Sequence, residues 1–504
     1  MELDRQVCDR ARKSRDVRFD GKFFIAVTST RIYCRPICPA RSPKDENIRY
    51  YPTAAAAEAA GFRPCLRCRP EASPGTPAWC GTSSVVSRAL RLIRDGALDR
   101  DGVDALADRL GVTARHLRRL FVQHLGAAPL DVALTHRVHF AKKLLDETPL
   151  AIAEVAFASG FGSLRRFNGE IRRTFSRTPT ELRRRARQQD AGPDCYRFRL
   201  AYRPPYDWAA MLAFLAARAT PGVEAVQANR YERTIAIAGR VGSIAIMPVD
   251  TSPALMLEVR ISDPRSLLTI VERVRRMFDI GADPAVVAEQ LSGEPLLKRA
   301  LVGHAGVRVP GAWDPFELTV RAILGQQISV RGATTIAGRV AERWGTPFPG
   351  SPGLTRLFPT PAELADAPFE AAGITGSRST TLRSLARSVR DGGVTFDGAD
   401  LTALGSITGI GDWTTQYVAM RALNEPDAFP SGDLVLRRMA GDCSARALER
   451  RSQAWRPWRA YAVMLLWQAA RDLDEHTRRT RHAHVDSHHP RPARGRRLAA
   501  AGAG

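Results

Sequence analysis

Four cysteines between residues 34 and 68 constrain the fold of this chain more than any other feature. Cys34 and Cys38 form a C-x3-C pair, and Cys65 and Cys68 form a C-x2-C pair within GFRPCLRC. Thiolates at this spacing can converge on one small metal ion, so the pattern is typical of a tetrahedral site with four sulfur ligands. We therefore predict one Zn²⁺ per chain, in a module too small to fold stably without its metal.

Arginines surround these cysteines in the sequence. Six of them lie close to a sulfur ligand, namely Arg31, Arg35, Arg41, Arg63, Arg67 and Arg69. This positive charge favours contact with a phosphate backbone. Residues Phe23 to Thr28 are predicted to form a strand and Thr53 to Gly61 a short helix, so the four sulfurs are expected on connecting loops.

The whole chain is strongly basic. Its 504 residues include 75 Lys and Arg against 52 Asp and Glu, a formal net charge of +23. That balance favours a polyanionic partner such as nucleic acid. No apolar run approaches the ~18 residues that span a bilayer, and the start of the chain lacks the apolar segment of a signal peptide. We expect a cytoplasmic protein with no membrane partner.

Two helix-turn-helix patterns follow the cysteine module. In residues 103–126, Gly111 interrupts an apolar helical pattern and Thr113 is a natural N-cap for the second helix. In residues 149–184, Gly160 makes the interruption and Ser163 provides the cap. The arginines expected to contact DNA from the two second helices are Arg115, Arg118, Arg165 and Arg166. A solvated helix face is the alternative reading of these arginines.

The segment between the two patterns sets their spacing. A helix from about Pro129 to Glu147 would span roughly 28 Å at about 1.5 Å per residue. Because one turn of DNA is about 34 Å long, both second helices could enter successive major grooves on one face of the duplex.

The second half of the chain begins with alternating strand and helix patterns. Strands are predicted at 198–202, 233–239, 243–249 and 254–261, with helices at 208–219 and 264–278. This order indicates an α+β domain. In isolation it indicates no chemistry.

A glycine turn and an aspartate carry the chemistry of this half. Gly409 and Gly411 lie in LGSITGIGDWTTQYVAM, where the turn between two helices would let backbone amides hold a DNA phosphate. Asp433 precedes an apolar helix, a position where an aspartate ordinarily acts as an N-cap. A helix C-cap is the alternative reading of the glycine turn.

These segments resemble known families. RFDGKFFIAVTSTRIYCRPICPAR with GFRPCLRC is similar to the amino-terminal domain of the Ada family of alkylation-response proteins, and EVAFASGF is similar to the AraC-type DNA-binding domain. RPPYDWAAMLAFLAARATPGVEAV resembles the amino-terminal domain of AlkA-type 3-methyladenine DNA glycosylases. AILGQQISVRGA, the hairpin, Asp433 and WRPWRAYAVMLLW occur in the order of the helix-hairpin-helix glycosylase superfamily.

The resemblance implies a multidomain fold that is mostly α, with one α+β domain. Its expected parts are a zinc and methyl-acceptor domain at 1–76, an AraC-type domain with two helix-turn-helix units at 82–188, an AlkA-like α+β domain at 195–308, an all-α helix-hairpin-helix domain at 309–474 and a basic disordered tail at 475–504. The absence of a PCHR motif predicts no O6-alkylguanine methyltransferase activity.

By the Ada resemblance, Cys34 is both zinc ligand and nucleophile, and accepts a methyl group irreversibly from a methylphosphotriester in DNA. Four thiolates on one Zn²⁺ leave a net charge of about −2, so methylation would remove one negative charge and raise DNA affinity. This implies a transcription activator that binds an operator and RNA polymerase. A purely structural zinc site is the alternative.

By the AlkA resemblance, Asp433 is the catalytic carboxylate of a glycosylase for alkylated bases of the 3-methyladenine and 7-methylguanine type. The residues implied for the base pocket are Trp413, Tyr417 and Trp467, and those implied for DNA contact are Gln326, Gln327, Gly409 and Gly411. Trp413 replaces the lysine of bifunctional members, so a monofunctional hydrolase is expected. Alternatively, the aromatic residues belong to the core and this half is an inactive DNA clamp. The expected protein is a monomer that binds double-stranded DNA, both alkylated and operator.

Overall fold

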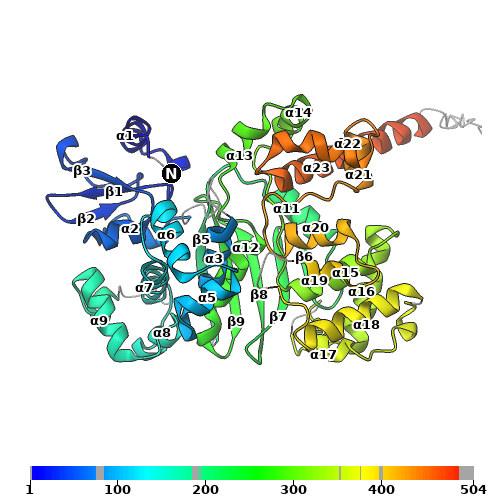
Figure 1. Cartoon of the computed structure of the whole chain (residues 1–504), viewed down its shortest axis with the longest axis horizontal. Helices are drawn as coiled ribbons and strands as arrows, with labels where there is room; N and C mark the ends of the chain where they lie inside the picture. The colour runs from blue at the N-terminus through cyan, green and yellow to red at the C-terminus, as the bar shows by residue number, and fades with distance from the viewer. Residues whose placement is uncertain are drawn as a thin grey trace, which may run out of the picture.

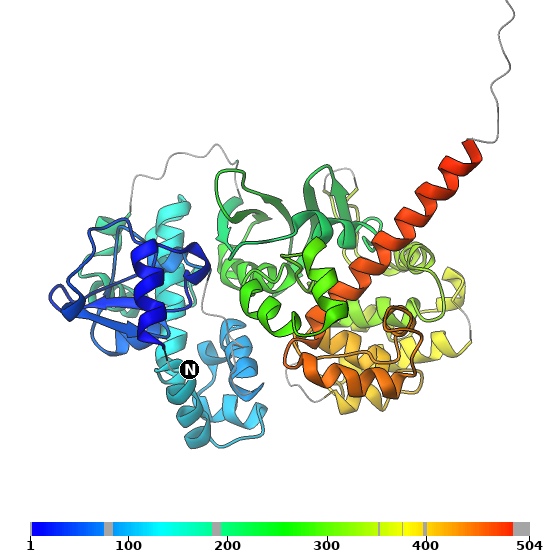
Figure 2. The same ribbon diagram turned by 90° about the horizontal axis from the view of Figure 1, so that it is seen from above.

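The domains follow one another in space as they do along the chain. Figures 1 and 2 show the first third (blue and cyan) at one side of the molecule, a central sheet (green) and the helices of the last third (yellow to red) at the other side. The computed structural model describes residues 3–74, 84–183, 192, 194–350, 353–374, 376–396 and 401–486.

The cysteine module is a small sheet between two helices. The sheet order is β3-β1-β2-β4, with only the β2–β4 pair parallel. Phe23 and Ile25 pack with α1, whereas Phe24 and Ala26 pack with α2, because successive strand residues point to opposite faces. The elements are α1 Arg5–Ser14, η1 Val17–Phe19, β1 Phe24–Val27, β2 Ile32–Cys34, η2 Asp45–Asn47, β3 Ile48–Tyr51, α2 Ala54–Ala59, β4 Arg63–Pro64 and η3 Pro70–Ala72.

Helices alone make up the next segment. Thr113 and Ser163 cap the second helices of the two helix-turn-helix units, as predicted. The long helix between the units runs from Pro129 to Glu147, also as predicted. The elements are α3 Ser84–Arg94, α4 Ala97–Arg100, α5 Val103–Arg109, α6 Ala114–Leu125, α7 Pro129–Glu147, α8 Ile152–Ala158, α9 Leu164–Phe175 and α10 Pro179–Leu182.

The central domain is an antiparallel five-stranded sheet of order β5-β9-β8-β7-β6. Helix α12 covers it with Ile270 and Val274, and the four predicted strands are present. Strand β6, at the sheet edge, was not predicted. The elements are β5 Cys195–Ala201, α11 Trp208–Ala216, β6 Glu224–Gln227, β7 Arg230–Ile237, β8 Arg240–Pro248, β9 Ala254–Ile261, η4 Pro264–Ser266 and α12 Leu267–Met277.

Helix α20 lies between two apolar cores of the last domain. Its Val418 belongs to the core formed with α15, α16 and α18, while its Met420 belongs to the core formed with α23. The elements are α13 Pro284–Leu291, α14 Pro295–Gly303, α15 Pro315–Leu324, α16 Val330–Trp344, α17 Pro361–Leu364, η5 Phe369–Ala372, α18 Ser377–Arg390, α19 Thr402–Gly405, α20 Asp412–Arg421, α21 Leu434–Met439, α22 Ala445–Ser452, η6 Gln453–Trp455 and α23 Arg459–Asp486.

The prediction of a disordered tail from residue 475 is wrong for its first part. Helix α23 continues to Asp486 and extends away from the body (Figure 2). Its first turns are buried in the core, and no Gly or Pro interrupts it, so continuing the helix costs little once those turns have formed. Residues 487–504 of the predicted tail lie outside the described residues. No helix in the described part of the chain is long and apolar enough to cross a membrane.

Candidate functional site

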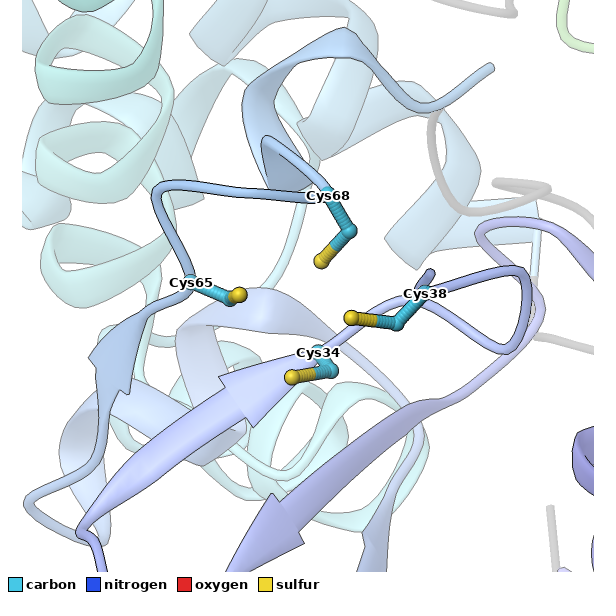
Figure 3. Close-up of side chains that lie close together, drawn as sticks. All are labelled: Cys34, Cys38, Cys65 and Cys68. Carbon is cyan, nitrogen blue, oxygen red and sulfur yellow. The ribbon is translucent and has the colours of Figure 1, made fainter. Parts of the chain in front are cut away.

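The four predicted sulfur ligands meet at one point. Cys34 ends strand β2, Cys38 lies on the loop after it, and Cys65 and Cys68 lie on the loop after β4 (Figure 3). All four sulfur atoms lie within 4.8 Å of one another. A short hydrogen-bonded turn holds the second pair, since Cys65 N donates to Tyr33 O at 3.0 Å and Arg69 N to Cys65 O at 3.0 Å. The four sulfurs fit a tetrahedral Zn²⁺ site.

The mutual repulsion of four closely spaced thiolates favours a bound cation. Close contact with the other three sulfurs, of which Cys38 acts most strongly, raises the pKa of the Cys34 thiol. Contact with Cys34 and Cys38 lowers the pKa of the Cys65 thiol. The sulfurs therefore compete for protons, and a bound dication allows all four to be thiolates at once.

Two of the six arginines near the cysteines are half-buried and form ion pairs within the protein, which the sequence pattern did not indicate. Arg35 donates to the buried Asp20 at 2.8 Å and to Cys68 O at 3.0 Å. Arg69 forms an ion pair with Asp146 of α7 at 2.6 Å. The other four are exposed or half-buried, namely Arg31, Arg41, Arg63 and Arg67.

A cavity of about 640 Å³ lies beside Cys34. Its lining includes the guanidinium-bearing side chains of Arg41, Arg63 and Arg67. It also includes Phe175, Ser176 and Arg177 from the end of α9, which belongs to the second helix-turn-helix unit. A phosphate backbone could thus approach Cys34 between positive side chains.

The predicted DNA-contacting arginines lie on the outer faces of the two second helices. Arg115 and Arg118 of α6 are exposed, opposite the buried Leu117 and Phe121. On α9 the exposed pair is Arg165 and Arg166, opposite the buried Phe167 and Ile171. Both sets are therefore available to a DNA groove, and their roles stay predictions.

The glycine turn between α19 and α20 uses its two glycines differently. Gly409 has φ +92°, and a Cβ there would lie 2.2 Å from Thr381 Oγ1. Gly411, the N-cap of α20, is exposed and a Cβ there would have no neighbour within 4 Å. Gln326 donates to Gly409 O at 2.9 Å and so fastens the turn to α15, whereas Gln327 is exposed with φ 60°.

The predicted carboxylate and aromatic residues share one cavity of about 680 Å³. Asp433 Oδ2 accepts the indole N–H of Trp413 at 3.1 Å, and its Oδ1 accepts that of Trp467 at 3.2 Å. The ring of Trp413 stacks on Tyr417 with centroids 5.1 Å apart and an interplanar angle of 9°. Trp455, Trp458 and Tyr461 are instead buried in the core.

Of the lining residues that were not predicted, Phe214, Arg218 and Arg421 bear most on the chemistry of the cavity. Phe214 of α11 and Arg218, which follows that helix, come from the α+β domain, and Arg421 comes from α20. Arg421 donates to Tyr417 Oη at 2.6 Å, and the Arg218 guanidinium lies 3.8 Å from the Phe214 ring centroid. Burial would raise the pKa of Tyr417, but Arg421 and Arg218 lower it on balance. The four-residue spacing of Tyr417 and Arg421 is a signal that could have identified Arg421.

Four family models match successive parts of the chain. They describe the metal binding domain of Ada (residues 7–71), a helix-turn-helix domain (106–185), the AlkA N-terminal domain (197–314) and the HhH-GPD superfamily of base excision DNA repair proteins (320–456). The probable bifunctional transcriptional activator/DNA repair enzyme AlkA of Mycobacterium tuberculosis is 42% identical, over 93% of this chain and 97% of that protein. This chain belongs to that family of bifunctional transcriptional activator/DNA repair enzymes.

Other matches each cover a part of this chain. DNA-3-methyladenine glycosylase 2 of Escherichia coli is 32% identical, over 54% of this chain and 96% of that protein. The bifunctional enzyme Ada of Escherichia coli is 40% identical over 23% of this chain and 31% of that protein. The solved 3-methyladenine DNA glycosylase of Archaeoglobus fulgidus is 20% identical, with a TM-score of 0.49, over 54% of this chain and 98% of that chain.

Membership of the family confirms several predictions. One chain combines a zinc-binding transcription regulator with a DNA repair enzyme of the glycosylase class, and DNA is its partner. The mostly α architecture with one α+β domain and the Zn²⁺ cofactor are also confirmed. The domain boundaries and the roles of individual site residues stay predictions.

Proposed function

We propose that the second half hydrolyses the N-glycosidic bond of purines methylated at N3 or N7, with Asp433 as the catalytic carboxylate. The observation that carries the proposal is the placement of this side chain. Two indole N–H groups and the N–H of Leu436, at 3.0 Å, hold its oxygens at the mouth of an aromatic cavity. The names of the glycosylase relatives support the substrate class.

The reaction follows from this geometry. The target base leaves the stack and enters the cavity, where Trp413 and Tyr417 offer aromatic faces to it. The bond between the sugar C1′ and the base nitrogen breaks, and the base keeps the electron pair, which neutralises its positive charge. Asp433 stabilises the positive charge that develops on the sugar while a water oxygen bonds to C1′ and releases one proton to bulk water. No lysine is required for this hydrolysis.

Base release from methylated DNA tests this half of the proposal. Asp433→Asn is expected to lower the release of 3-methyladenine by about 10²-fold or more, because the charge that stabilises the transition state is lost. Asparagine is as good an N-cap as aspartate, so helix α21 and the fold are retained. Release at the wild-type rate by the variant would show that Asp433 is not the catalytic carboxylate, whereas a wild-type protein that releases no base would support the inactive-clamp alternative.

We further propose that Cys34 takes the methyl group of a DNA methylphosphotriester. Bound Zn²⁺ would keep the four sulfurs deprotonated at neutral pH. The Cys34 sulfur attacks the methyl carbon, the bond from carbon to the phosphate oxygen breaks, and a phosphodiester anion leaves. The half-buried position of Cys34 beside an arginine-lined cavity supports this role.

Intact-protein mass spectrometry after incubation with methylphosphotriester DNA tests the transfer. Wild type is expected to gain the mass of one methyl group, located on Cys34 by peptide mapping, whereas Cys34→Ser is expected to gain none. A wild-type protein that binds zinc and gains no methyl group would favour the purely structural site. Recruitment of RNA polymerase and a monomeric state stay predictions.

A further inference from the structure

Two domains build the cavity beside Cys34. One wall comes from the zinc module, through Cys34 itself, Arg41 and Arg63. The facing wall comes from the end of α9, through Phe175 and Arg177. The methyl-acceptor site proposed above is therefore completed by a residue of the second helix-turn-helix unit, more than a hundred positions along the chain.

The two walls are held together by an apolar contact and by ion pairs. Leu66, between two of the sulfur ligands, packs against the core cluster that contains Ile171 and Phe175 of α9. Arg69, next to Cys68 in sequence, binds Asp146 of α7 at 2.6 Å. Because Leu66 and Arg69 belong to the ligand loop itself, these contacts fix the sulfurs relative to the helical segment that contains α7 and α9.

The backbone around Arg177 is also held. Ser176 ends α9 in the left-handed region, with φ 55°, and its N–H donates to Arg172 O. On the other side Thr178 caps α10, and its side chain and backbone N–H are joined to Glu181 in a capping box. Arg177 therefore projects from a turn fixed at both ends, and its side chain is exposed at the cavity.

We propose that Arg177 binds the DNA backbone at the methyl-acceptor site, through the charged phosphate next to the methylated one. The inference rests on the methyl transfer proposed for Cys34. A methylphosphotriester has no net charge, so the guanidinium groups at the cavity can hold it only through its anionic neighbours. Arg177 then lets the second helix-turn-helix unit contact the same stretch of backbone that donates the methyl group, so the sensor and the DNA-reading unit engage the DNA together.

The test measures the rate of methyl transfer to full-length protein from a tetranucleotide whose central linkage is a methylphosphotriester. A substrate this short carries no operator sequence, so sequence-specific binding contributes nothing to the rate. Arg177→Ala is expected to slow transfer about tenfold at low salt, the effect of losing one charged hydrogen bond. Arg177→Lys, which retains the charge, is expected to recover part of the rate.

Arg173→Ala is the matched control. Arg173 lies near the end of α9, four residues before Arg177, is exposed and pairs with Glu170, but does not line the cavity. Its transfer rate is expected to stay within about twofold of wild type. The rate of Arg177→Ala should also fall less steeply with added salt than that of wild type, because one phosphate contact is missing; a merely structural role would leave this slope unchanged.

The outcomes separate the two proposals. If the wild-type protein gains no methyl group at all, the methyl transfer itself is refuted. If wild type is methylated and Arg177→Ala matches it in rate and salt dependence, the transfer stands and the role of Arg177 is overturned. Equal unfolding temperatures of the three arginine variants and wild type would exclude a folding defect as the cause of any loss.

Discussion

The carboxylate of Asp433 caps helix α21 and faces the base cavity at the same time. Its Oδ1 accepts the N–H of Leu436 at 3.0 Å, the bond expected of an N-cap. The same oxygen also accepts the indole N–H of Trp467 at 3.2 Å, on the cavity side. The cap is therefore compatible with the proposed catalytic role, because the capping carboxylate still lines the cavity.

Arg218 places positive charge beside a cavity for which we propose cationic bases. Burial lowers the pKa of the Arg218 guanidinium. Because the pKa of an arginine side chain ordinarily lies far above neutral pH, the group still carries its positive charge. Arg218→Gln is expected to favour a cationic base over a neutral one, by about fivefold for the removal of ~1 kcal/mol of charge repulsion. The measurement compares release of 7-methylguanine with release of neutral hypoxanthine from matched duplexes.

The control for this change is Arg438→Gln. Arg438 also lines the cavity, but its side chain is 56% exposed and water screens its charge. Its ratio of the two release rates should equal that of wild type. An Arg218→Gln ratio that is also unchanged would show that this guanidinium does not act on the charge of the bound base.

A buried network between the zinc module and α7 makes one contribution to stability depend on pH. Glu58 accepts from Tyr33 and Thr135 at 2.8 Å each, and His139 Nε2 lies 3.0 Å from it. Burial alone would lower the pKa of His139, but the Glu58 carboxylate raises it on balance above 6.5. Burial would likewise raise the pKa of Glu58, and His139 with the two hydroxyls lowers it below 4.5.

His139→Gln tests the sign of this effect. A raised histidine pKa contributes stability that is fully present below pH 6.5 and lost as the pH rises through the folded-state pKa. The unfolding temperature of wild type should therefore exceed that of the variant most at about pH 6, and the difference should shrink towards pH 9. Thermal unfolding of both proteins at several pH values measures it. A difference that stays constant over this range would contradict the assignment.

The two glycines of the hairpin give an element-scale test. Gly409→Ala is expected to destabilise the protein by about 1–3 kcal/mol, because φ +92° is strained for alanine and its Cβ would collide with Thr381. Gly411 has a φ of −92°, which alanine adopts readily, and there is open space for a Cβ. Gly411→Ala should therefore lower the free energy of unfolding by less than about 1 kcal/mol. It should nevertheless weaken duplex binding, since a methyl group would stand beside the amide proposed to hold a phosphate.

Chemical unfolding and duplex affinity at one fixed salt concentration are the two measurements. Gly409→Ala is expected to lose more stability than Gly411→Ala. Gly411→Ala is expected to lose duplex affinity although its stability changes little. If Gly411→Ala binds the duplex as tightly as wild type, the amide at that position does not contact DNA.

Elements with local signals were predictable, and contacts between distant segments were not. Pro129 and the N-caps Thr113 and Ser163 mark where three helices begin. The predicted starts of these helices therefore agree with the observed ones. Strand β6 has four residues at a sheet edge and too short a pattern to identify. Phe214 and Arg218 enter the base cavity only because the α+β domain packs against α20 and α23, which no local pattern records.

At the scale of the whole molecule, the regulatory and repair halves share one apolar core. The cluster that contains Phe140 of α7 and Phe167 of the second helix-turn-helix unit also contains Phe198 and Leu257 of the central sheet. The rings of Phe140 and Phe198 have centroids 6.1 Å apart. Polar contacts flank this core, with His136 at 3.1 Å from Glu272 and Arg276 at 2.7 Å from Asp95. The halves are therefore expected to unfold together.

Phe140→Ala tests this coupling. Truncating a buried phenylalanine is expected to cost about 3–5 kcal/mol, and here the loss falls on the junction between the halves. Wild type should show one calorimetric transition, whereas the variant should unfold in two steps, with the regulatory half first. Val122→Ala, at a side chain that is 57% exposed on α6, is the control and should change stability by less than about 0.5 kcal/mol. Two separate transitions already in wild type would show that the shared core does not couple the halves, and operator binding would then have no route through it to the glycosylase.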